Sequence, residues 1–294
     1  MFRLGLIGYP LGHSLSPGIH QAALQAMGLA GEYRLYPVEP LPVGQDDLAQ
    51  LVDWVRLGEL DGLNVTIPHK PSVVPLLDEL TPTATGIGAV NTIFREGDRL
   101  LGDNTDAPGF LAELQRLNVT GPGRALVLGA GGSARSVVFG LAQQGWQIRI
   151  AARRLGQAQS LANSIAQARM APELPQATIL SRPGLLGGLS ADLIVNTTPV
   201  GMTPLLDANP WPADLPLPRG AFVYDLIYNP AETLLLGAAR QAGLQTANGL
   251  GMLVEQAALS LERWTGKPVP RAAMWAALED FIQASRSIRQ PEEQ

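Results

Sequence analysis

Residues 124–135 read Arg-Ala-Leu-Val-Leu-Gly-Ala-Gly-Gly-Ser-Ala-Arg, an apolar stretch that runs directly into three closely spaced glycines. The apolar stretch predicts a buried strand, and the apolar sequence after the glycines predicts a helix. A glycine-rich loop in this position is typical of dinucleotide-binding domains. Gly129 permits the tight turn, Gly131 lets the backbone approach a pyrophosphate, and Ala134 lets the helix lie close to the strand. The alternative is an ordinary tight turn without a ligand.

The alternation of strand and helix continues beyond this loop. Apolar strands are predicted at 147–151, 193–196 and 222–226, with a shorter one near 178–180, and a helix is predicted over 155–168. Strands that alternate with helices form a parallel sheet with helices on both faces. This part of the chain is therefore expected to be a Rossmann-type, doubly wound nucleotide-binding domain.

The N-terminal part of the chain also alternates between strands and helices, but it includes a hairpin. Predicted strands are 2–8, 33–38, 60–66, 90–95 and 99–102, and predicted helices are 16–28, 45–57 and 71–77. Since hairpin strands pair antiparallel, we expect an α/β domain with a mixed, mostly parallel sheet. A helix over 107–117 connects the two halves, and helices at 252–263 and 272–284 close the chain.

Length and composition indicate a compact soluble protein. A chain of 294 residues is long for one hydrophobic core, so two domains are expected. Hydrophobic residues make up 46% of the chain and charged residues 16%. No apolar run is long enough to span a bilayer, and no signal segment opens the sequence. We therefore expect a cytoplasmic protein that does not contact membranes.

Cysteine, histidine and net charge argue against other kinds of site. The absence of cysteine excludes disulfides, thiolate metal sites and a cysteine nucleophile. The three histidines (His13, His20 and His69) lack the spacing of a zinc site, so no metal is expected. The formal net charge of −5 argues against general nucleic-acid binding.

Positive charge is concentrated around the glycine loop. Residues 114–172 contain no Asp or Glu, but they contain Arg116, Arg124, Arg135, Arg149, Arg153, Arg154 and Arg169. A basic segment in an acidic protein indicates a bound anion. Arg153 and Arg154 follow the second nucleotide-domain strand, where an NAD site would carry a carboxylate, and a guanidinium pairs well with a 2′-phosphate. NADP is therefore expected in preference to NAD. The alternative is that these arginines are only solvated.

Lys70 is one of only two lysines, against nineteen arginines, and it ends the stretch Asn-Val-Thr-Ile-Pro-His-Lys at 64–70. A lysine amine can give and take a proton, whereas arginine stays charged. Asp106, at the end of Asp-Asn-Thr-Asp, would form with it a lysine–carboxylate couple for proton transfer. Taken alone, Lys70 is explained as a surface lysine and Asp106 as a helix N-cap.

Two more polar clusters are candidates for ligand contacts. Ser14 and Ser16 precede a predicted helix whose N-terminus would help them to bind a carboxylate, although Ser16 is also explained as the N-cap. Asn91 lies inside an otherwise apolar predicted strand. Because a buried amide must find partners, Asn91 is either a member of a network or a ligand contact.

In order and spacing, these clusters resemble the shikimate dehydrogenase family over nearly the whole chain. The matching pieces are S-L-S at 14–16, N-V-T-I-P-H-K at 64–70, A-V-N-T at 89–92, D-N-T-D at 103–106, G-A-G-G-S-A-R at 129–135, N-T-T-P-V-G-M at 196–202, Y-D-L-I-Y at 224–228 and N-G-L-G-M-L-V-E-Q-A at 248–257. Each piece alone is weak, whereas the ordered set is highly specific.

The resemblance implies the reversible, NADP-linked interconversion of 3-dehydroshikimate and shikimate in aromatic amino-acid biosynthesis. It implies that Lys70 and Asp106 handle the proton at the C3 oxygen, and that Ser14 and Ser16 bind the substrate carboxylate. Further substrate contacts would be Thr66, Asn91, Tyr228 and Gln256, with Asn64 in a supporting position. The cofactor would be lined by Gly129, Ala130, Gly131, Gly132, Ser133, Ala134, Arg153, Arg154, Thr197, Thr198, Leu226, Gly249 and Met252.

The same resemblance implies how the chain is divided. Gln256 lies beyond the nucleotide domain, so the chain is expected to return to its first domain. The expected division is 1–106 plus 251–294 for substrate binding and catalysis, and 107–250 for NADP. Either a monomer or a homodimer is expected.

One segment departs from the family pattern, which has Asn-Arg-Thr and then a second arginine after the second nucleotide-domain strand. Here Arg154 replaces the threonine and Gln157 replaces the second arginine. How strongly NADP is preferred over NAD is therefore open. The sequence leaves two alternatives: a quinate/shikimate dehydrogenase that uses NAD, and a sensor that binds shikimate-like acids without turnover.

Overall fold

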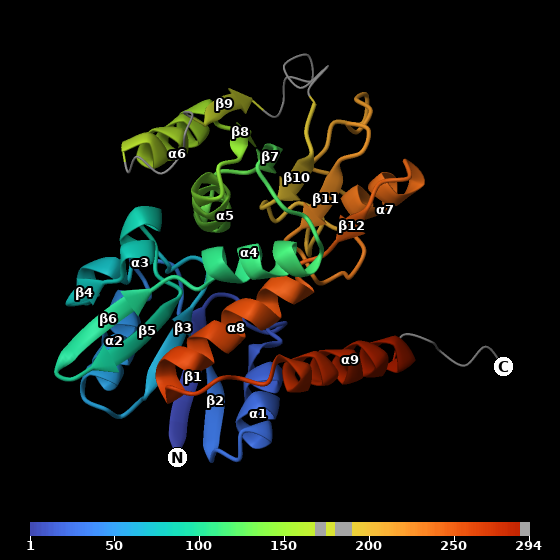
Figure 1. Cartoon of the computed structure of the whole chain (residues 1–294). Coiled ribbons are helices and arrows are strands. Elements are labelled where there is room, and N and C mark those ends of the chain that lie inside the picture. The colour runs from blue at the N-terminus through green and yellow to red at the C-terminus, as the bar shows by residue number, and fades with distance from the viewer. Residues whose placement is uncertain (168–174, 180–189, 289–294) are drawn as a thin grey trace. The chain divides into compact units, whose positions relative to one another are not determined.

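The computed structural model describes residues 1–167, 175–179 and 190–288, and the chain divides into two compact units (Figure 1). The first unit contains Met1–Thr105 and Val254–Gln294, and the second contains Asp106–Leu253. The chain beyond Leu253 therefore belongs to the first unit.

The first unit is built on a mixed six-stranded sheet with the order β2-β1-β3-β5-β6-β4. Its strands are β1 (Phe2–Gly8), β2 (Gly31–Pro37), β3 (Gly62–Val65), β4 (Glu79–Leu80), β5 (Thr92–Glu96) and β6 (Arg99–Asp103). Strand β1 runs parallel to β2 and β3, and β4 runs parallel to β6. Only β5 runs against its neighbours. The predicted mixed, mostly parallel sheet is confirmed.

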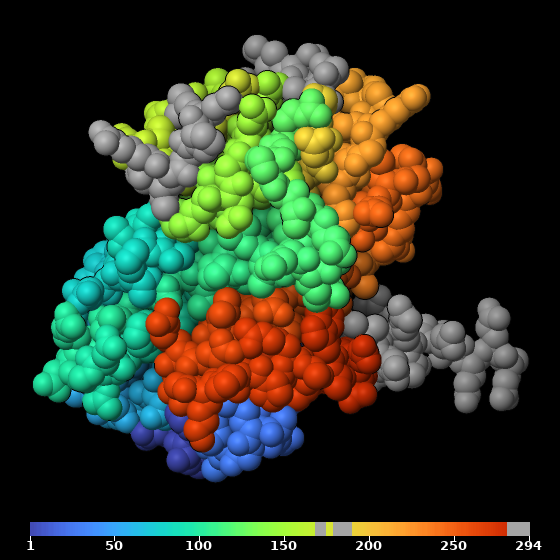
Figure 2. Space-filling view, viewed as in Figure 1, coloured from blue at the N-terminus to red at the C-terminus, as the bar shows by residue number. Residues whose placement is uncertain are grey.

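The first unit also contains the following helices. They are α1 (Ser16–Ala26), α2 (Gln45–Arg56), a short 3-10 helix η1 (Val74–Leu76), α3 (Pro82–Ile87), the part of α8 (Leu250–Thr265) that lies beyond Leu253, and α9 (Arg271–Ile288). Helix α2 buries Leu48, Leu51 and Val55, three to four residues apart, against the core around Leu63 and Ile93. Helix α9 packs beside α1, and its red surface adjoins the blue N-terminal segments in Figure 2.

The second unit is a doubly wound sheet in which all described strand pairs are parallel. Its elements are α4 (Asp106–Arg116), β7 (Arg124–Leu128), α5 (Gly132–Gln143), β8 (Gln147–Ala152), α6 (Leu155–Gln167), β9 (Gln176–Ile179), β10 (Leu193–Asn196), β11 (Phe222–Asp225), α7 (Leu234–Gln241) and β12 (Thr246–Ala247). The order is β12-β11-β10-β7-β8-β9. The chain thus winds outward from β7 in one direction and from β10 in the other, which is the Rossmann order.

Three local predictions are corrected. Ser16 is not an N-cap but the first residue of α1, and its N–H donates to the Ser14 hydroxyl (3.3 Å). The helix predicted over 71–77 is only the 3-10 helix η1, because the proline at position 75 has no N–H to continue an α-helix. Asn91 lies just before β5 rather than inside a strand. Arg169 and the last residue of the strand predicted near 178–180 lie outside the described residues.

Candidate functional site

Polar residues gather at one edge of the first sheet, where β3 and β6 end and β5 begins. Three backbone hydrogen bonds join these strand ends. The Val65 N–H donates to the Asn91 carbonyl (2.8 Å), the Asn91 N–H to the Asp103 carbonyl (3.0 Å), and the Val90 N–H to the Lys70 carbonyl (2.9 Å). The sequence motifs that contain these residues are therefore neighbours in space.

Lys70 is buried at this edge, with only 8% of its surface exposed. That burial excludes the alternative of an ordinary surface lysine. Lysine is almost never buried unless its ammonium group has partners. A buried ammonium group beside polar strand ends suits proton transfer to a bound ligand. The other lysine, Lys267, is exposed.

Asn91 fixes the backbone directly before Asp106. Its side-chain oxygen accepts the Thr105 N–H (2.8 Å), and its side-chain N–H donates to the Thr105 hydroxyl (3.0 Å). The Thr92 hydroxyl donates to the same oxygen (2.9 Å). Asn91 is thus a member of a buried network. Asp106 follows as the first residue of α4 and is itself buried.

Asp103 holds the same segment from another side. One carboxylate oxygen accepts the Thr81 hydroxyl (2.6 Å) and the Asn104 N–H (2.8 Å). The other oxygen accepts two N–H groups of Arg263 (2.7 and 3.1 Å). The Asn104 side chain donates to the Ala89 carbonyl (3.0 Å). Sequence reasoning missed Thr81 and Arg263, since both are distant in the chain and neither lies in a recognisable motif.

Both the oxygen and the nitrogen of the Asn64 side-chain amide form hydrogen bonds with other residues. The Tyr33 hydroxyl donates to its oxygen (2.8 Å), while its N–H groups donate to the Ser260 hydroxyl (2.9 Å) and the Asn91 carbonyl (3.0 Å). These partners favour a supporting role for Asn64. Ser260 was missed by sequence reasoning, but its position four residues after Gln256 puts both on one face of α8, which is a signal that the sequence carries.

Ser14 and Ser16 are linked to this network through a buried histidine. The His20 Nδ1–H donates to the Ser16 carbonyl (2.9 Å), and the His20 ring stacks on Tyr33 at 4.0 Å. Burial lowers the pKa of His20 to about 4, so the ring is neutral at neutral pH. Burial also raises the pKa of Tyr33. Ser14 is half-buried and Ser16 is buried.

The remaining predicted substrate contacts are half-buried. Thr66 directly follows β3, and its N–H donates to the Ile7 carbonyl (2.8 Å). The carbonyl of Gln256 accepts the Ser260 hydroxyl (3.0 Å). Tyr228 belongs to the second unit, and burial raises the pKa of its phenol. These three side chains combine partial exposure with a polar group, as a ligand contact requires.

In the second unit, the glycine loop connects β7 to α5 as predicted. Gly129 has a φ of +112°, and a Cβ added there would lie 2.5 Å from the Thr197 hydroxyl oxygen. A Cβ added at Gly131 or Gly132 would instead meet no atom within 4 Å. Since α5 begins at Gly132, this open space lies beside the free N–H groups of a helix N-terminus. The loop therefore fits a phosphate-containing cofactor.

Thr197 and Thr198 follow β10, the neighbour of β7 at the point where the strand order reverses. The N–H and the hydroxyl of Thr197 both donate to the Leu128 carbonyl (2.9 and 2.7 Å). The Thr198 hydroxyl donates to the Asn196 side-chain oxygen (2.7 Å). In open α/β sheets, ligands bind beyond the carboxyl ends of the strands at this reversal. The two predicted loops thus lie where a dinucleotide would bind.

Two glycines near the start of α8 are required by close contacts. A Cβ added at Gly249 would lie 2.0 Å from the Leu226 carbonyl oxygen, and a Cβ added at Gly251 would lie 2.0 Å from the Glu113 carboxyl carbon. The Gly249 N–H donates to the Ile227 carbonyl (3.2 Å). Leu226 and Gly249, both predicted to line the cofactor, are therefore in contact, and the buried Met252 follows on the same helix.

Arg153 and Arg154 follow β8 and are exposed. Neither forms an ion pair with another described residue. The Arg154 carbonyl accepts the Gln157 N–H (3.1 Å) at the start of α6, so its backbone is fixed while its side chain is free to bind an anion. Both guanidinium groups are available to a 2′-phosphate.

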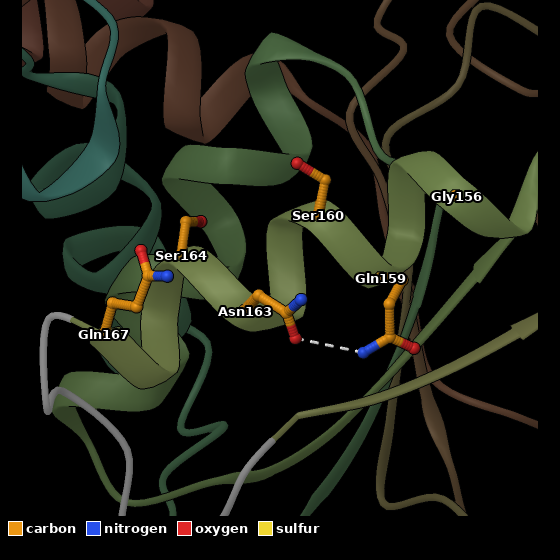
Figure 3. A pocket seen from close by; sticks show the side chains of 6 residues that line it. All are labelled: Gly156, Gln159, Ser160, Asn163, Ser164 and Gln167. Carbon is orange, nitrogen blue, oxygen red and sulfur yellow. Dashed lines mark hydrogen bonds between the residues drawn. The ribbon is translucent and has the colours of Figure 1, made fainter.

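A cavity of about 480 Å³ lies along the polar face of α6 (Figure 3). It is lined by Gly156, Gln159, Ser160, Asn163, Ser164 and Gln167. The Gln159 side chain donates to the Asn163 side-chain oxygen (3.1 Å). None of the predicted site residues lines this cavity, and its lining carries no charge, so it is distinct from the candidate nucleotide site.

Residues 1–167, 175–179 and 190–288 contain no group of three His, Asp or Glu side chains that could hold a metal ion. Among the helices described, none has the length and apolar character to cross a membrane.

Two family models match separate parts of the chain. The model for the shikimate dehydrogenase substrate binding domain matches residues 6–93, and that for the shikimate 5′-dehydrogenase C-terminal domain matches residues 249–279. Among curated proteins, the chain is 42% identical over 282 residues to a shikimate dehydrogenase (NADP(+)) from Symbiobacterium thermophilum, with 94% of each chain covered.

Solved structures resemble the chain over nearly its whole length. A shikimate dehydrogenase in complex with NADP+ gives a TM-score of 0.86 at 37% identity and covers 96% of both chains. The Thermus thermophilus shikimate 5-dehydrogenase, in complex with NADP(H) and shikimate, gives 0.82 at 36% identity, with 95% of this chain and 99% of that chain covered. A quinate dehydrogenase from Corynebacterium glutamicum in complex with NAD gives 0.85 at 32% identity, with coverage of 95% and 99%.

Proposed function

The chain belongs to the shikimate dehydrogenase family, and on that premise we propose that it catalyses the reversible, NADP-linked reduction of 3-dehydroshikimate to shikimate. The observation that carries this proposal is a relative 42% identical over 94% of the chain and named for that activity. The burial of Lys70 and the open space beside the glycine loop also support the proposal.

The proposed reaction needs a hydride and a proton at one carbonyl group. NADPH, when bound, supplies the hydride to the carbonyl carbon. The protein must then give a proton to the oxygen. We assign that proton to Lys70, with Asp106 as its acidic partner. Burial of both residues supports this role, because exclusion of bulk water strengthens the electrostatic interactions of such groups with a bound ligand.

Polar residues of the first unit, together with Tyr228 of the second, would orient the substrate. The proposed substrate is a small polyol acid, so its site requires hydroxyl and amide groups. We assign its carboxylate to Ser14 and Ser16, and its hydroxyl groups to Thr66, Asn91, Gln256 and Tyr228. Asn64 supports them, since its own amide is bonded to Tyr33 and Ser260.

The loops of the second unit would hold the cofactor. The free N–H groups at the start of α5, beside Gly131 and Gly132, would bind the pyrophosphate. Arg153 would pair with the 2′-phosphate, with Arg154 beside it. The segments around Thr198, Leu226 and Gly249 would line the remaining part. This assignment agrees with the expected division into a substrate domain (1–106 plus 251–294) and a nucleotide domain (107–250), which is part of the proposal. We also propose a cytoplasmic monomer or homodimer.

An absorbance assay tests the proposed function. Purified protein is mixed with shikimate and NADP, and formation of reduced nicotinamide is followed. Rapid formation with NADP and slow formation with NAD is the expected result. A second candidate is NAD-linked oxidation of quinate, because the quinate dehydrogenase has the same fold. Faster turnover of quinate with NAD would favour that candidate, and no turnover with either pair would favour a ligand sensor.

A further inference from the structure

Asp225, the last residue of β11, is a wholly buried carboxylate to which the proposed mechanism gives no role. It forms no ion pair with a described residue. Three neutral donors surround it instead. The Asn196 side-chain N–H (2.9 Å) and the Ile227 N–H (3.1 Å) donate to one oxygen, and the Thr233 hydroxyl (2.7 Å) donates to the other. Such an arrangement satisfies a buried carboxylate without a cation.

The first of these bonds fixes the orientation of a neighbouring amide. Because Asn196 turns its N–H group toward Asp225, its side-chain oxygen is left to accept from Thr198. That oxygen receives both the Thr198 N–H (3.0 Å) and the Thr198 hydroxyl (2.7 Å). If the amide were flipped, an N–H group would face these two donors. The carboxylate therefore determines, through Asn196, how the segment after β10 is held.

The other bonds fix the segment that follows β11. The Ile227 N–H is held by Asp225, and the Leu226 N–H donates to the Asn196 carbonyl (3.0 Å). The Ile227 carbonyl in turn accepts the Gly249 N–H (3.2 Å). One buried side chain thus connects three of the segments to which the proposed function assigns the cofactor.

We propose that Asp225 is a positioning residue for the cofactor, which acts through Asn196 and touches neither NADP nor substrate. The inference rests on the proposed function for the identity of the cofactor. The ionised form of the Asp225 side chain accepts three hydrogen bonds, from Asn196, Ile227 and Thr233. Neutralising the side chain weakens the bonds from Asn196 and Ile227, because a hydrogen bond to an ionised acceptor is about twice as strong as one to a neutral acceptor, so the segments after β10 and β11 are held less firmly.

The charge state of this residue changes within an accessible pH range. Burial raises the pKa of Asp225 to about 6, and the bonds from Thr233, Ile227 and Asn196 only partly oppose that shift. Strands β10 and β12 bring no charged side chain to it, and on α7 the guanidinium of Arg240 is exposed and paired with Glu232. The titratable neighbour is the Tyr224 phenol, whose pKa burial also raises. Cofactor binding is therefore expected to weaken as the pH falls through about 6.

The test is the binding of NADP alone, measured by calorimetry on the full-length protein. Asp225→Asn is expected to raise the Kd for NADP about tenfold at about pH 8, while the KM for shikimate stays within about twofold. The wild-type Kd is expected to rise between about pH 7 and pH 5 more steeply than that of the variant. The 2′-phosphate of NADP titrates equally in both proteins, so the difference between them isolates Asp225.

Thr233→Val is the matched control. It removes the bond to the other carboxylate oxygen and the cap of α7, where the Thr233 hydroxyl accepts the Leu236 N–H (3.3 Å), but it leaves Asn196 in place. It is expected to lower stability and to change the Kd for NADP less than about twofold. An equal rise in the Kd for NADP in both variants would overturn the proposal, because any loosening of this region would then weaken NADP binding, whether or not it acts through Asn196. So would an unchanged Kd in Asp225→Asn.

A measurement on the wild-type protein covers the case in which Asp225→Asn does not fold. NAD has no 2′-phosphate, so a rise in its KM between about pH 7 and pH 5 must come from the protein. A KM for NAD that does not change over this range would overturn the proposal. Failure of the proposed function would look different: NADP would bind with the expected pH dependence, but shikimate would not be oxidised.

Discussion

The Asn91 side chain bonds to both the backbone and the side chain of Thr105: its oxygen accepts the Thr105 N–H (2.8 Å), and its N–H donates to the Thr105 hydroxyl (3.0 Å). Thr105 is the residue before Asp106, so a side chain at the entrance of β5 fixes the backbone from which α4 begins. Both residues are buried, where such bonds are not exchanged for bonds to water. The proposed acidic partner of Lys70 is therefore positioned from outside its own helix.

Replacement of Asn91 by leucine, which has a similar shape, tests this relationship. The variant leaves the Thr105 N–H without its buried acceptor and removes one of the partners of the Thr105 hydroxyl, so we expect kcat/KM for shikimate to fall about 100-fold or more. Binding of NADP should change less than about twofold, since the nucleotide loops are not involved. A variant with wild-type kcat/KM would show that the Asn91–Thr105 pair does not position the site.

Lys70→Ala is expected to reduce kcat by about 1,000-fold or more while shikimate still binds with a Kd within about threefold of wild type. The reason is that the ammonium group gives its proton in the chemical step. The chain supplies its own control, because Lys267 is the only other lysine and is exposed. Lys267→Ala should leave kcat unchanged. Ordinary turnover in Lys70→Ala would remove this lysine from the chemistry.

Sequence reasoning succeeded where a structural signal is local. The loop at Gly129 was predicted because strand, glycines and helix follow one another within a few residues, and the same alternation predicted the parallel sheet of the second unit. The short helix α3 was missed, although Thr81 and Pro82 are good starting residues and the Thr81 hydroxyl accepts the Ala84 N–H (3.2 Å). Six residues that include Gly and three Thr or Pro give no periodic pattern.

The partners of the supporting residues could not be predicted, because they are distant in the chain. Arg263 and Asp103 are 160 positions apart, and Ser260 and Asn64 are 196 apart. Nothing in either local sequence specifies the partner. Asp225 stood inside a recognised motif, but its burial depends on how α7 packs on β11. Family motifs thus indicated which segments form the site, whereas the hydrogen bonds that fix those segments required the tertiary structure.

Arg153→Ala is expected to raise the KM for NADP at least tenfold and the KM for NAD less than about twofold. Arg153 is exposed and has no described carboxylate partner, so its loss should affect only the 2′-phosphate. Arg154→Ala, measured in parallel, determines which guanidinium group binds it. Equal effects of Arg153→Ala on both cofactors would mean that this arginine does not recognise the 2′-phosphate.

His20 predicts how the stability of the first unit depends on pH. Burial lowers its pKa from 6.5 to about 4, so between these values the unfolded chain binds a proton that the folded chain does not. The free energy of unfolding must therefore fall as the pH decreases through this window. At about pH 4.5, His20 should account for a loss of about 2–3 kcal/mol relative to about pH 7. Protonation of the folded protein at His20 is unfavourable because the ring is buried. Its Nδ1–H already donates to the Ser16 carbonyl, and Nε2, which would take up the proton, has no partner among the described residues.

Urea unfolding of the wild-type protein and His20→Asn at the two pH values measures this contribution. Asparagine keeps an N–H donor for the Ser16 carbonyl but does not titrate, so it should be less stable than wild type at about pH 7 and lose less stability on acidification. Carboxylates that also titrate in this range are common to both proteins, and the difference between the two pH dependences isolates the histidine. If both proteins lose the same free energy between about pH 7 and pH 4.5, the His20 ring is protonated within the fold, and the buried link from Ser16 to Tyr33 carries a charge.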